Sequence, residues 1–270
     1  MTKTKLRIFS YQPNPRIFKS TITARICNIQ IEVRGAKPKE LKNWLWDFDA
    51  HPMSKDDLKD QKEYIQKAKA GYQGELYKTE AFLSAHPYGT VPAAFSPDGK
   101  IGVFESNSIM RAVARLDKSN SGLYGHDPYS ASRIDGFLDT TLLFARESQI
   151  YLLALMADKL NEKVYYDTER ALTNWLSGIE SALTNNDFIC SDTLTLADIC
   201  FCCELLLIQS EHQWIEAITE IGEKLLSSKA IEDRFPRSLN HYEKLSARTD
   251  FSPDIKDHRA KIKSGQKIYD

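Results

Sequence analysis

The first third of the chain alternates between strand-like and helix-like patterns of apolar residues. Residues 5–11 alternate in polarity and are rich in β-forming side chains, which predicts a strand. Apolar residues then recur at a helical spacing over 16–27, and residues 29–35 predict a second strand that ends at Gly35. A strand, a helix and a strand in this order predict an α/β domain with parallel pairing.

The segment 36–76 lacks such a regular pattern. It is polar and charged, apart from an aromatic cluster at Trp44, Trp46 and Phe48. Capping and stop signals predict a surface helix near 55–70. A connection of this length is unusual in a compact domain and is often functional. The aromatic side chains either line a substrate pocket or anchor the segment to the core, and the sequence leaves both interpretations open.

Strand and helix signals return after this insertion. A short helix is predicted over 79–85, and strands at 90–95 and 100–105 flank a Pro-Asp-Gly turn that is typical of an antiparallel hairpin. A helix over 106–116 follows, with Ser106 as its cap. This order of elements matches a thioredoxin-like sheet.

The second half of the chain has no strand signals. Residues 117–129 are polar and contain Gly and Pro, which predicts a linker after a first domain over 1–116. Apolar stripes at helical spacing, such as the one within 172–183, predict an all-helical domain over 130–252. The polar tail 253–270 is expected to be partly mobile or draped over the surface.

Composition narrows the class of protein. The 270 residues are enough for two domains, and 36 basic against 37 acidic residues give a net charge of −1. This balance offers no electrostatic attraction to nucleic acid or to an acidic membrane. The start of the chain lacks the apolar core of a signal peptide, and no stretch approaches the roughly 20 apolar residues of a membrane helix. A cytoplasmic protein without nucleic-acid or membrane partners is expected.

The cysteine pattern argues against a metal site. Three of the five cysteines fall in one apolar run, and their spacing is not that of a zinc site. Reduced cysteines that pack as small hydrophobic residues are expected instead. The cysteines are Cys27, Cys190, Cys200, Cys202 and Cys203.

Two segments resemble glutathione transferases. Residues 86–116 resemble the family's Asn-Pro-x-Gly-x-Val-Pro segment, its hairpin and its Glu-Ser-x-x-Ile motif, and residues 191–201 resemble the Thr-x-x-Asp helix start of the second domain. The resemblance covers 5–34 and 77–250. It implies an α/β thioredoxin-like N-terminal domain plus an all-α C-terminal helical bundle, with an enlarged insertion between the second strand and the second helix.

The resemblance also implies a glutathione site. The Val91–Pro92 peptide is cis in the family, and the backbone of Val91 pairs with the cysteinyl part of glutathione. Glu105 meets the ammonium and Ser106 the carboxylate of the γ-glutamyl end, where a helix N-terminus favours an anion. Lys78 matches a position that binds the glycine carboxylate. Each of these residues also has a purely structural interpretation. In it, Pro92 begins a strand, Ser106 caps a helix and Lys78 is a solvated lysine. His86 stands where the family usually has Asn.

The residue that would activate the thiol stays open. A free thiol titrates at roughly pH 8.5, so the family places a Tyr, Ser or Cys donor after the first strand. No cysteine stands there in this chain. Asn14 falls on the usual serine position, Tyr11 is the second candidate and Arg16 the third. Asn14 also fits the interpretation of a turn residue between two prolines. In that case no side chain of the protein donates a hydrogen bond directly to the sulfur.

The start of the predicted helix after Ser191 has a structural meaning. Thr195 and Asp198 have the form of a capping box, in which each side chain bonds the backbone of the other residue. This pair is interpreted as a folding device rather than as part of an active site.

Two functions are compatible with these observations. The resemblance implies a homodimeric transferase that uses glutathione as co-substrate, needs no metal, lowers the pKa of the thiol and directs the thiolate at a small hydrophobic electrophile. Residues 11–24 and 76–95 are also similar to the gamma subunit of the eukaryotic translation elongation factor complex. The alternative is therefore a non-catalytic interaction module with the same fold.

Overall fold

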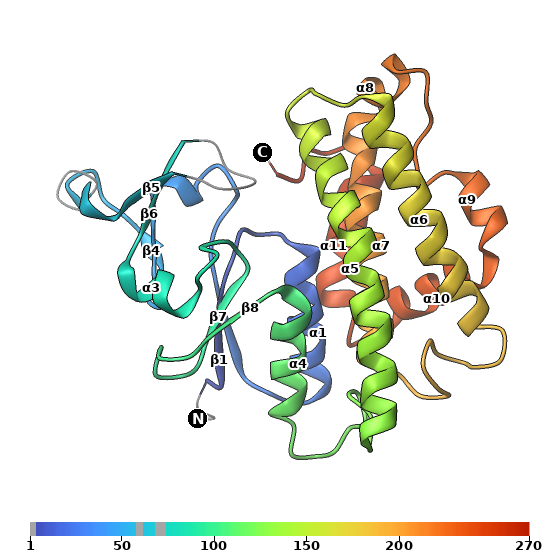
Figure 1. Ribbon diagram of the computed structural model, residues 1–270, viewed down its shortest axis with the longest axis horizontal. Helices are drawn as coiled ribbons and strands as arrows, with labels where there is room; N and C mark the ends of the chain where they lie inside the picture. Colours follow the sequence, from blue (N-terminus) through green and yellow to red (C-terminus); the bar gives the residue numbers. More distant parts are fainter. Residues whose placement is uncertain (1–3, 58–61, 68–73, 270) are drawn as a thin grey trace. The chain divides into compact units, whose positions relative to one another are not determined.

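The protein is described by a computed structural model that covers residues 4–57, 62–67 and 74–269 (Figure 1). The chain divides into two compact units. The first comprises Met1–Lys118 with Tyr269–Asp270, and the second comprises Ser119–Ile268.

A four-stranded mixed sheet is the centre of the first unit. The elements of this layer are β1 (Leu6–Phe9), α1 (Pro15–Ile26), β2 (Ile31–Arg34), β7 (Ala93–Phe95), β8 (Gly102–Phe104) and α4 (Ser106–Arg115). The strand order is β2-β1-β7-β8; β1 pairs with β2 in parallel, and β7 pairs antiparallel with β1 and β8. The predicted parallel start, the hairpin and the thioredoxin-like arrangement are confirmed.

Alternation along the strands gives this sheet two different faces. Successive side chains of a strand point to opposite sides. Ile8 of β1 packs with Ile17 of α1 and Ile109 of α4 on one face. Phe9, the next residue, packs with Trp46 of the insertion on the other. Helices α1 and α4 therefore cover one side of the sheet, and the insertion covers the opposite side (Figure 1).

The insertion folds into a second sheet, which the sequence did not reveal. Its elements are η1 (Leu41–Asn43), β3 (Trp44–Trp46), β4 (His51–Pro52), η2 (Lys62–Tyr64), β5 (Ile65–Lys67) and β6 (Glu75–Lys78), with α3 (Glu80–Ala85) after them. The strand order is β4-β3-β6-β5. Helix α3 begins after Thr79, whose hydroxyl accepts a hydrogen bond from the Phe82 amide at 3.0 Å.

The helix predicted near 55–70 is not continuous: Asp57 is helical, but the prediction is wrong over residues 62–67. The capping signal is real, because the Asp57 amide donates to Ser54 Oγ at 3.2 Å and the Ser54 amide donates to the Asp57 carboxylate at 2.8 Å. The chain then forms η2 and β5, and β5 pairs antiparallel with β6. A partner strand outweighs a weak helix propensity. Residues 58–61 and 68–70 lie outside the described residues.

Every regular element of the second unit is helical, over the residues 119–268 that the structure describes throughout. Helix α7 is buried at each of its residues and forms the centre. The helices are α5 (Pro128–Met156), α6 (Glu162–Ala182), α7 (Leu196–Ile208), η3 (Gln209–Trp214), α8 (Ile215–Glu220), α9 (Lys229–Arg234), α10 (Pro236–Ala247) and α11 (Ser252–Lys263).

The tail beyond residue 252 differs from the expectation of a mobile or surface-draped segment. It begins with the helix α11, which buries Ile255, His258 and Ile262. These positions share one helical face, since residues three and four apart are neighbours on a helix. The many charged residues between them hide this stripe in the sequence.

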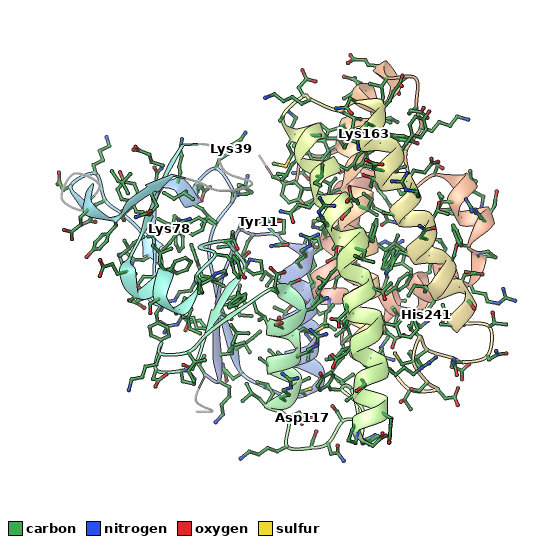
Figure 2. The ribbon with its side chains drawn as sticks, viewed as in Figure 1. Tyr11, Lys39, Lys78, Asp117, Lys163 and His241 are labelled. Atoms are coloured by element: carbon green, nitrogen blue, oxygen red, sulfur yellow. The ribbon has the colours of Figure 1, made fainter. Side chains whose placement is uncertain are left out.

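The predicted capping box at the start of α7 is present. The buried Asp198 carboxylate accepts from the Thr195 amide at 2.8 Å and from the Ile189 amide at 2.9 Å. It also lies 2.8 Å from Nε2 of His241, which is on α10 (labelled in Figure 2). This carboxylate therefore connects the start of α7 to two other segments of the bundle.

The five cysteines, all within the described residues, form no disulfide, and most of them are buried. Burial raises the pKa of Cys202 to about 12 and that of Cys190 to about 11. Such thiols hold little thiolate at neutral pH and are poor nucleophiles. The described helices include none that is both long and apolar enough to span a membrane.

Candidate functional site

The predicted site residues converge at one end of the first sheet. Phe9 and Phe104 are both register partners of Ala93, the first residue of β7. The chain after β1, the chain before β7 and the chain after β8 must therefore lie at the same end of three adjacent strands. This arrangement brings Tyr11, Pro92 and Glu105 to one edge, although 94 positions separate the first from the last.

The corner after β8 has an unusual backbone. Glu105 precedes α4 with φ 67° and ψ 126°, a conformation that residues other than glycine rarely adopt. Its side chain is exposed and makes no capping hydrogen bond. Backbone conformations of this kind cost about 1–3 kcal/mol and cluster at functional sites. The strained corner thus marks this end of the sheet.

Ser106 is not the cap that the sequence predicts. It is the first residue of α4, and Glu105 takes the N-cap position. The buried Ser106 hydroxyl instead accepts a hydrogen bond from Nζ of Lys19, at 3.2 Å. The same Nζ donates to Oδ1 of Asn107 at 2.8 Å. Because the backbone enters α4 through a strained residue, Ser106 lies one position too far along the chain to cap it.

The peptide between Val91 and Pro92 is cis, as the resemblance implies. Val91 is half-buried and precedes β7, whose register with both neighbours starts at Ala93. The backbone of Val91 thus lies beyond the paired part of the strand, at the edge where an extended ligand could continue the pairing.

His86 lies in the turn that leads to this strand. Its ring is buried between Phe82 and Phe104, with ring centroids at 5.8 and 5.2 Å. Neither ring nitrogen has a well-aligned hydrogen-bond partner among the described residues. Burial lowers the pKa of His86, which keeps the imidazole neutral. The side chain that replaces the family's Asn is therefore part of the packing.

Lys78 occupies a buried position rather than an exposed one. Its Nζ donates to the Gly89 carbonyl at 2.6 Å and lies 4.9 Å from the centre of the Trp46 ring. Figure 2 shows Lys78 at the end of β6, among the insertion strands. Lys78 holds the turn that ends at Gly89, just before Val91. A direct contact with a glycine carboxylate stays a prediction.

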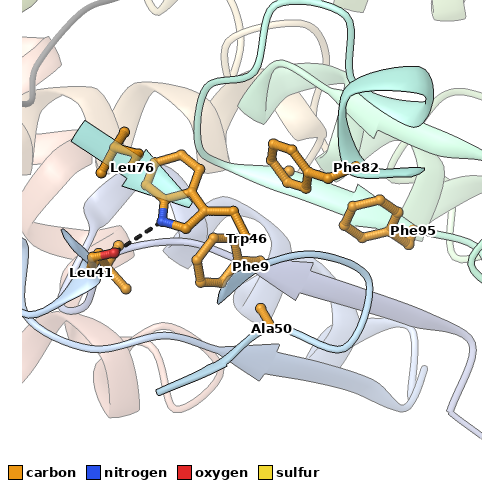
Figure 3. Close-up of a cluster of buried hydrophobic side chains, with 8 residues drawn as sticks. Phe9, Leu41, Trp46, Ala50, Leu76, Phe82 and Phe95 are labelled. Carbon is orange, nitrogen blue, oxygen red and sulfur yellow. Dashed lines mark hydrogen bonds between the residues drawn. The ribbon is translucent and has the colours of Figure 1, made fainter. Parts of the chain in front are cut away.

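The insertion aromatics anchor the insertion to the main sheet. Trp46 is only 1% exposed, donates from Nε1 to the Leu41 carbonyl at 3.0 Å and packs edge-on against Phe9 and Phe82 (Figure 3). Trp44 stacks on Phe9, and Phe48 packs against Phe95. Of the two interpretations of this cluster, the structure shows the anchoring one.

The candidates for thiol activation differ in their surroundings. Asn14 is the buried N-cap of α1: its Oδ1 accepts from the Arg16 amide at 3.0 Å, and its Nδ2 donates to Ser10 Oγ at 3.1 Å. Tyr11 is half-buried, and its ring meets Tyr269 of the same unit edge to face, with centroids 6.2 Å apart. One of the two amide protons of Asn14 is thus already used inside the protein.

Comparison with known proteins finds similarity to glutathione S-transferases in both sequence and fold. The model of the glutathione S-transferase C-terminal domain matches residues 143–212. Solved transferases share the fold. An epsilon-class enzyme from the housefly Musca domestica covers 97% of this chain and 98% of its own, with a TM-score of 0.63 and 15% identity. The chain therefore has the fold of the glutathione S-transferases, and part of its helical unit matches their C-terminal domain.

The curated proteins similar to this chain include two kinds. A probable elongation factor 1-gamma of Arabidopsis thaliana is 32% identical over 139 residues, which are 50% of this chain and 32% of that protein. The chain thus spans about a third of the length of that relative. Glutathione S-transferase F9 of the same plant is 30% identical over 130 residues, 46% of this chain and 60% of that protein.

A transferase from Methylobacillus flagellatus, solved with glutathione bound, shares the fold with a TM-score of 0.59. It is 12% identical, over 92% of this chain and 98% of its own.

The buried Lys19 was not predicted from the sequence as a residue of this site. Lys19 is 1% exposed, although it belongs to one of the residue types that are seldom buried. The available signal was its position: Pro15, Lys19 and Thr23 follow one another at four-residue steps along α1, and all three are buried. In the sequence this stripe is obscured because the neighbouring Ile17 and Ile22 dominate the apolar pattern.

The helical unit carries an open groove of about 510 Å³ between α5 and α6. Leu143 lies in it with 71% of its surface exposed, beside charged side chains of both signs. The lining residues are Thr140, Leu143, Phe144, Arg146, Glu147, Lys163, Asp167, Arg170, Ala171, Asn174 and Trp175.

Proposed function

We propose that this protein binds glutathione at the end of the β2-β1-β7-β8 sheet where Tyr11, Val91 and Glu105 converge. The observation that carries the proposal is the strained Glu105 corner at the start of α4, next to the cis peptide before β7. Free amide groups and partial positive charge at a helix N-terminus favour a bound carboxylate.

Three contacts would hold the tripeptide in an extended form. Its cysteinyl backbone would pair with Val91, which lies at the unpaired start of β7. Its γ-glutamyl carboxylate would accept from Ser106 and the first turn of α4, and the exposed Glu105 carboxylate would meet the ammonium group. Lys78 would contribute indirectly, because its hydrogen bond to the Gly89 carbonyl fixes the turn just before Val91.

We propose that the bound thiol is then used as a nucleophile. The thiolate would attack a small hydrophobic electrophile, form a sulfur–carbon bond and displace the leaving group with its electron pair. Holding both reactants in place supplies much of the rate of such a reaction. The protein would work as a cytoplasmic detoxifying transferase, with no metal in this chemistry.

The direct hydrogen bond to sulfur is assigned to Tyr11 rather than to Asn14. Asn14 is 1% exposed, caps α1 and donates one of its two amide protons to Ser10, so its side chain already serves the fold. Tyr11 follows β1 at the end of the sheet where the cysteinyl group would lie. Tyr11→Phe should lower the rate of conjugation and raise the pKa of bound glutathione, whereas Asn14 variants should mainly lose stability.

Loss of the exposed carboxylate gives the first test of binding. Glu105→Ala removes the proposed partner of the glutathione ammonium, and an exposed side chain contributes little to the fold. Calorimetric titration with glutathione should show a dissociation constant raised by about tenfold or more, with an unchanged melting temperature. Unchanged affinity would mean that the site lies elsewhere. Asp98→Ala, in the exposed turn of the hairpin, is the matched control.

The second candidate function is a non-catalytic interaction module. Two observations favour it: the amide of Asn14 is engaged inside the protein, and relatives named elongation factor 1-gamma match half of the chain. An assay with a generic aryl halide distinguishes the two functions. Conjugation above the uncatalysed rate supports the transferase, whereas binding of glutathione without turnover supports the module.

We also propose that two copies form a two-fold dimer. Such isologous contacts are the commonest mode of assembly. The groove between α5 and α6 offers an exposed leucine and charges of both signs, which is what a self-complementary surface needs.

A further inference from the structure

Lys19 places a buried ammonium group directly under the first turn of α4. The side chain lies on α1 with 1% exposure, and its Nζ donates to Ser106 Oγ and to Asn107 Oδ1. Burying an ammonium group is costly unless it is hydrogen-bonded. A cation near a helix N-terminus also opposes the helix dipole. Stability alone therefore gives little reason for a lysine at this position.

The hydrogen bond from Lys19 decides how the Ser106 hydroxyl is used. A serine hydroxyl has one proton and two lone pairs, whereas an ammonium group can only donate. Nζ takes one lone pair of Ser106 Oγ, so the hydroxyl proton must point away from the lysine. Among the described residues the structure shows no acceptor for this proton. Ser106 is thus prepared to donate to an acceptor outside the protein.

We propose that Lys19 is a positioning residue that aims the Ser106 hydroxyl at the γ-glutamyl carboxylate of glutathione. This inference rests on the proposed glutathione site. The anion would take the hydroxyl proton and would offset the positive charge of the buried ammonium and of the helix N-terminus. Lys19 itself would not touch the ligand. Asn107 holds Nζ in place from the neighbouring position of α4.

A set of variants and two ligands test this role. Titration calorimetry would compare the parent protein with Lys19→Met, Ser106→Ala and the double variant. The ligands are glutathione and γ-aminobutyryl-cysteinyl-glycine, which lacks the glutamyl α-carboxylate but keeps the ammonium group. Each single variant should bind glutathione about tenfold more weakly, and the double variant should lose little more, because Lys19 acts through Ser106. The analogue should bind all four proteins with similar affinity.

Two further variants separate positioning from folding. Lys19→Gln keeps a donor for Ser106 without the charge, and should retain more affinity for glutathione than Lys19→Met. Thr23→Val lies one turn further along the buried face of α1 and should leave affinity unchanged. If Lys19→Met does not fold, Ser106→Ala alone still decides, since an unchanged affinity there overturns the proposal.

The outcomes are distinguishable. Additive losses in the double variant, or an equal loss for the analogue, would show that Lys19 does not work through the hydroxyl and the carboxylate, and would overturn the inference while the glutathione site stands. A parent protein that binds neither ligand would overturn the proposed function together with the inference.

Discussion

At the scale of single residues, the buried polar side chains carry most of what the sequence could not show. Asn14 has the residue type of a ligand-binding amide and of a turn residue, and only its contact with Ser10 shows that its amide serves the fold. The local pattern around Lys19 shows at most that the position is buried, because the partners Ser106 and Asn107 stand 87 and 88 positions away. Glu105, Val91 and Pro92 could be selected from the sequence because their motif is local.

His258 gives a residue-scale prediction about acid stability. It is 2% exposed, and burial lowers its pKa to about 4. The unfolded chain binds a proton near pH 6.5 and the folded chain does not, so the free energy of unfolding should fall as the pH drops from 6.5 to 4. His258→Gln removes the titrating group, so the free energy of unfolding should fall by up to about 3 kcal/mol less over this pH range.

Urea unfolding of His258→Gln and its parent at pH 7 and at pH 4.5 measures this difference. His126→Gln, at an exposed position, is the matched control for the loss of a histidine. An equal acid sensitivity of parent and His258→Gln would show that His258 titrates normally in the folded protein.

At the scale of elements, the sequence predicted those whose partners are close in the chain. The spans of α1, β2, α3 and α4 agree with the prediction to within a few residues. The strands of the insertion were not predicted. Strand β5 forms only by pairing with β6, and β3 only by pairing with β4 and β6. Helix α11 was missed because its three buried positions are separated by charged ones.

The insertion anchor gives an element-scale prediction. Trp46→Ala removes a side chain packed against Phe9 and Phe82 and should lower the free energy of unfolding by about 3–5 kcal/mol. The KM for the electrophile should not change, because this ring fills the core. A changed KM with unchanged stability would support the alternative that Trp46 lines a substrate pocket. Trp44→Ala, at a half-buried position of the same strand, should cost less.

The capping box of α7 gives a second element-scale prediction. Asp198→Ala leaves the buried Thr195 and Ile189 amides without their acceptor and should cost about 3 kcal/mol or more. Asp127→Ala removes the exposed N-cap of α5 and should cost only about 1 kcal/mol. Chemical denaturation of the two variants compares them, and equal losses would mean that burial adds nothing to the cap.

At the scale of the whole molecule, the fold could be predicted from the sequence, whereas the surface that would join two copies could not. The division into a thioredoxin-like unit and a helical unit follows from where strand signals stop. The groove between α5 and α6 depends on how two helices pack, which no periodicity reports.

The groove gives the prediction at this scale. Leu143→Glu places a charge on the exposed apolar part of the proposed dimer surface and should convert a dimer into a monomer of about half the mass in light scattering. Ile215→Glu, at a 51% exposed position on α8, is the control and should remain dimeric. A parent protein that is monomeric at high concentration would exclude this assembly.

The central claim is that glutathione lies along the start of β7 with its amino-acid end at the beginning of α4. A crystal structure of the protein with glutathione measures this most directly. The γ-glutamyl carboxylate is expected within hydrogen-bond distance of Ser106, with the cysteinyl backbone paired with Val91. Glutathione bound away from these residues, or crystals that take up none at saturating concentration, would contradict it.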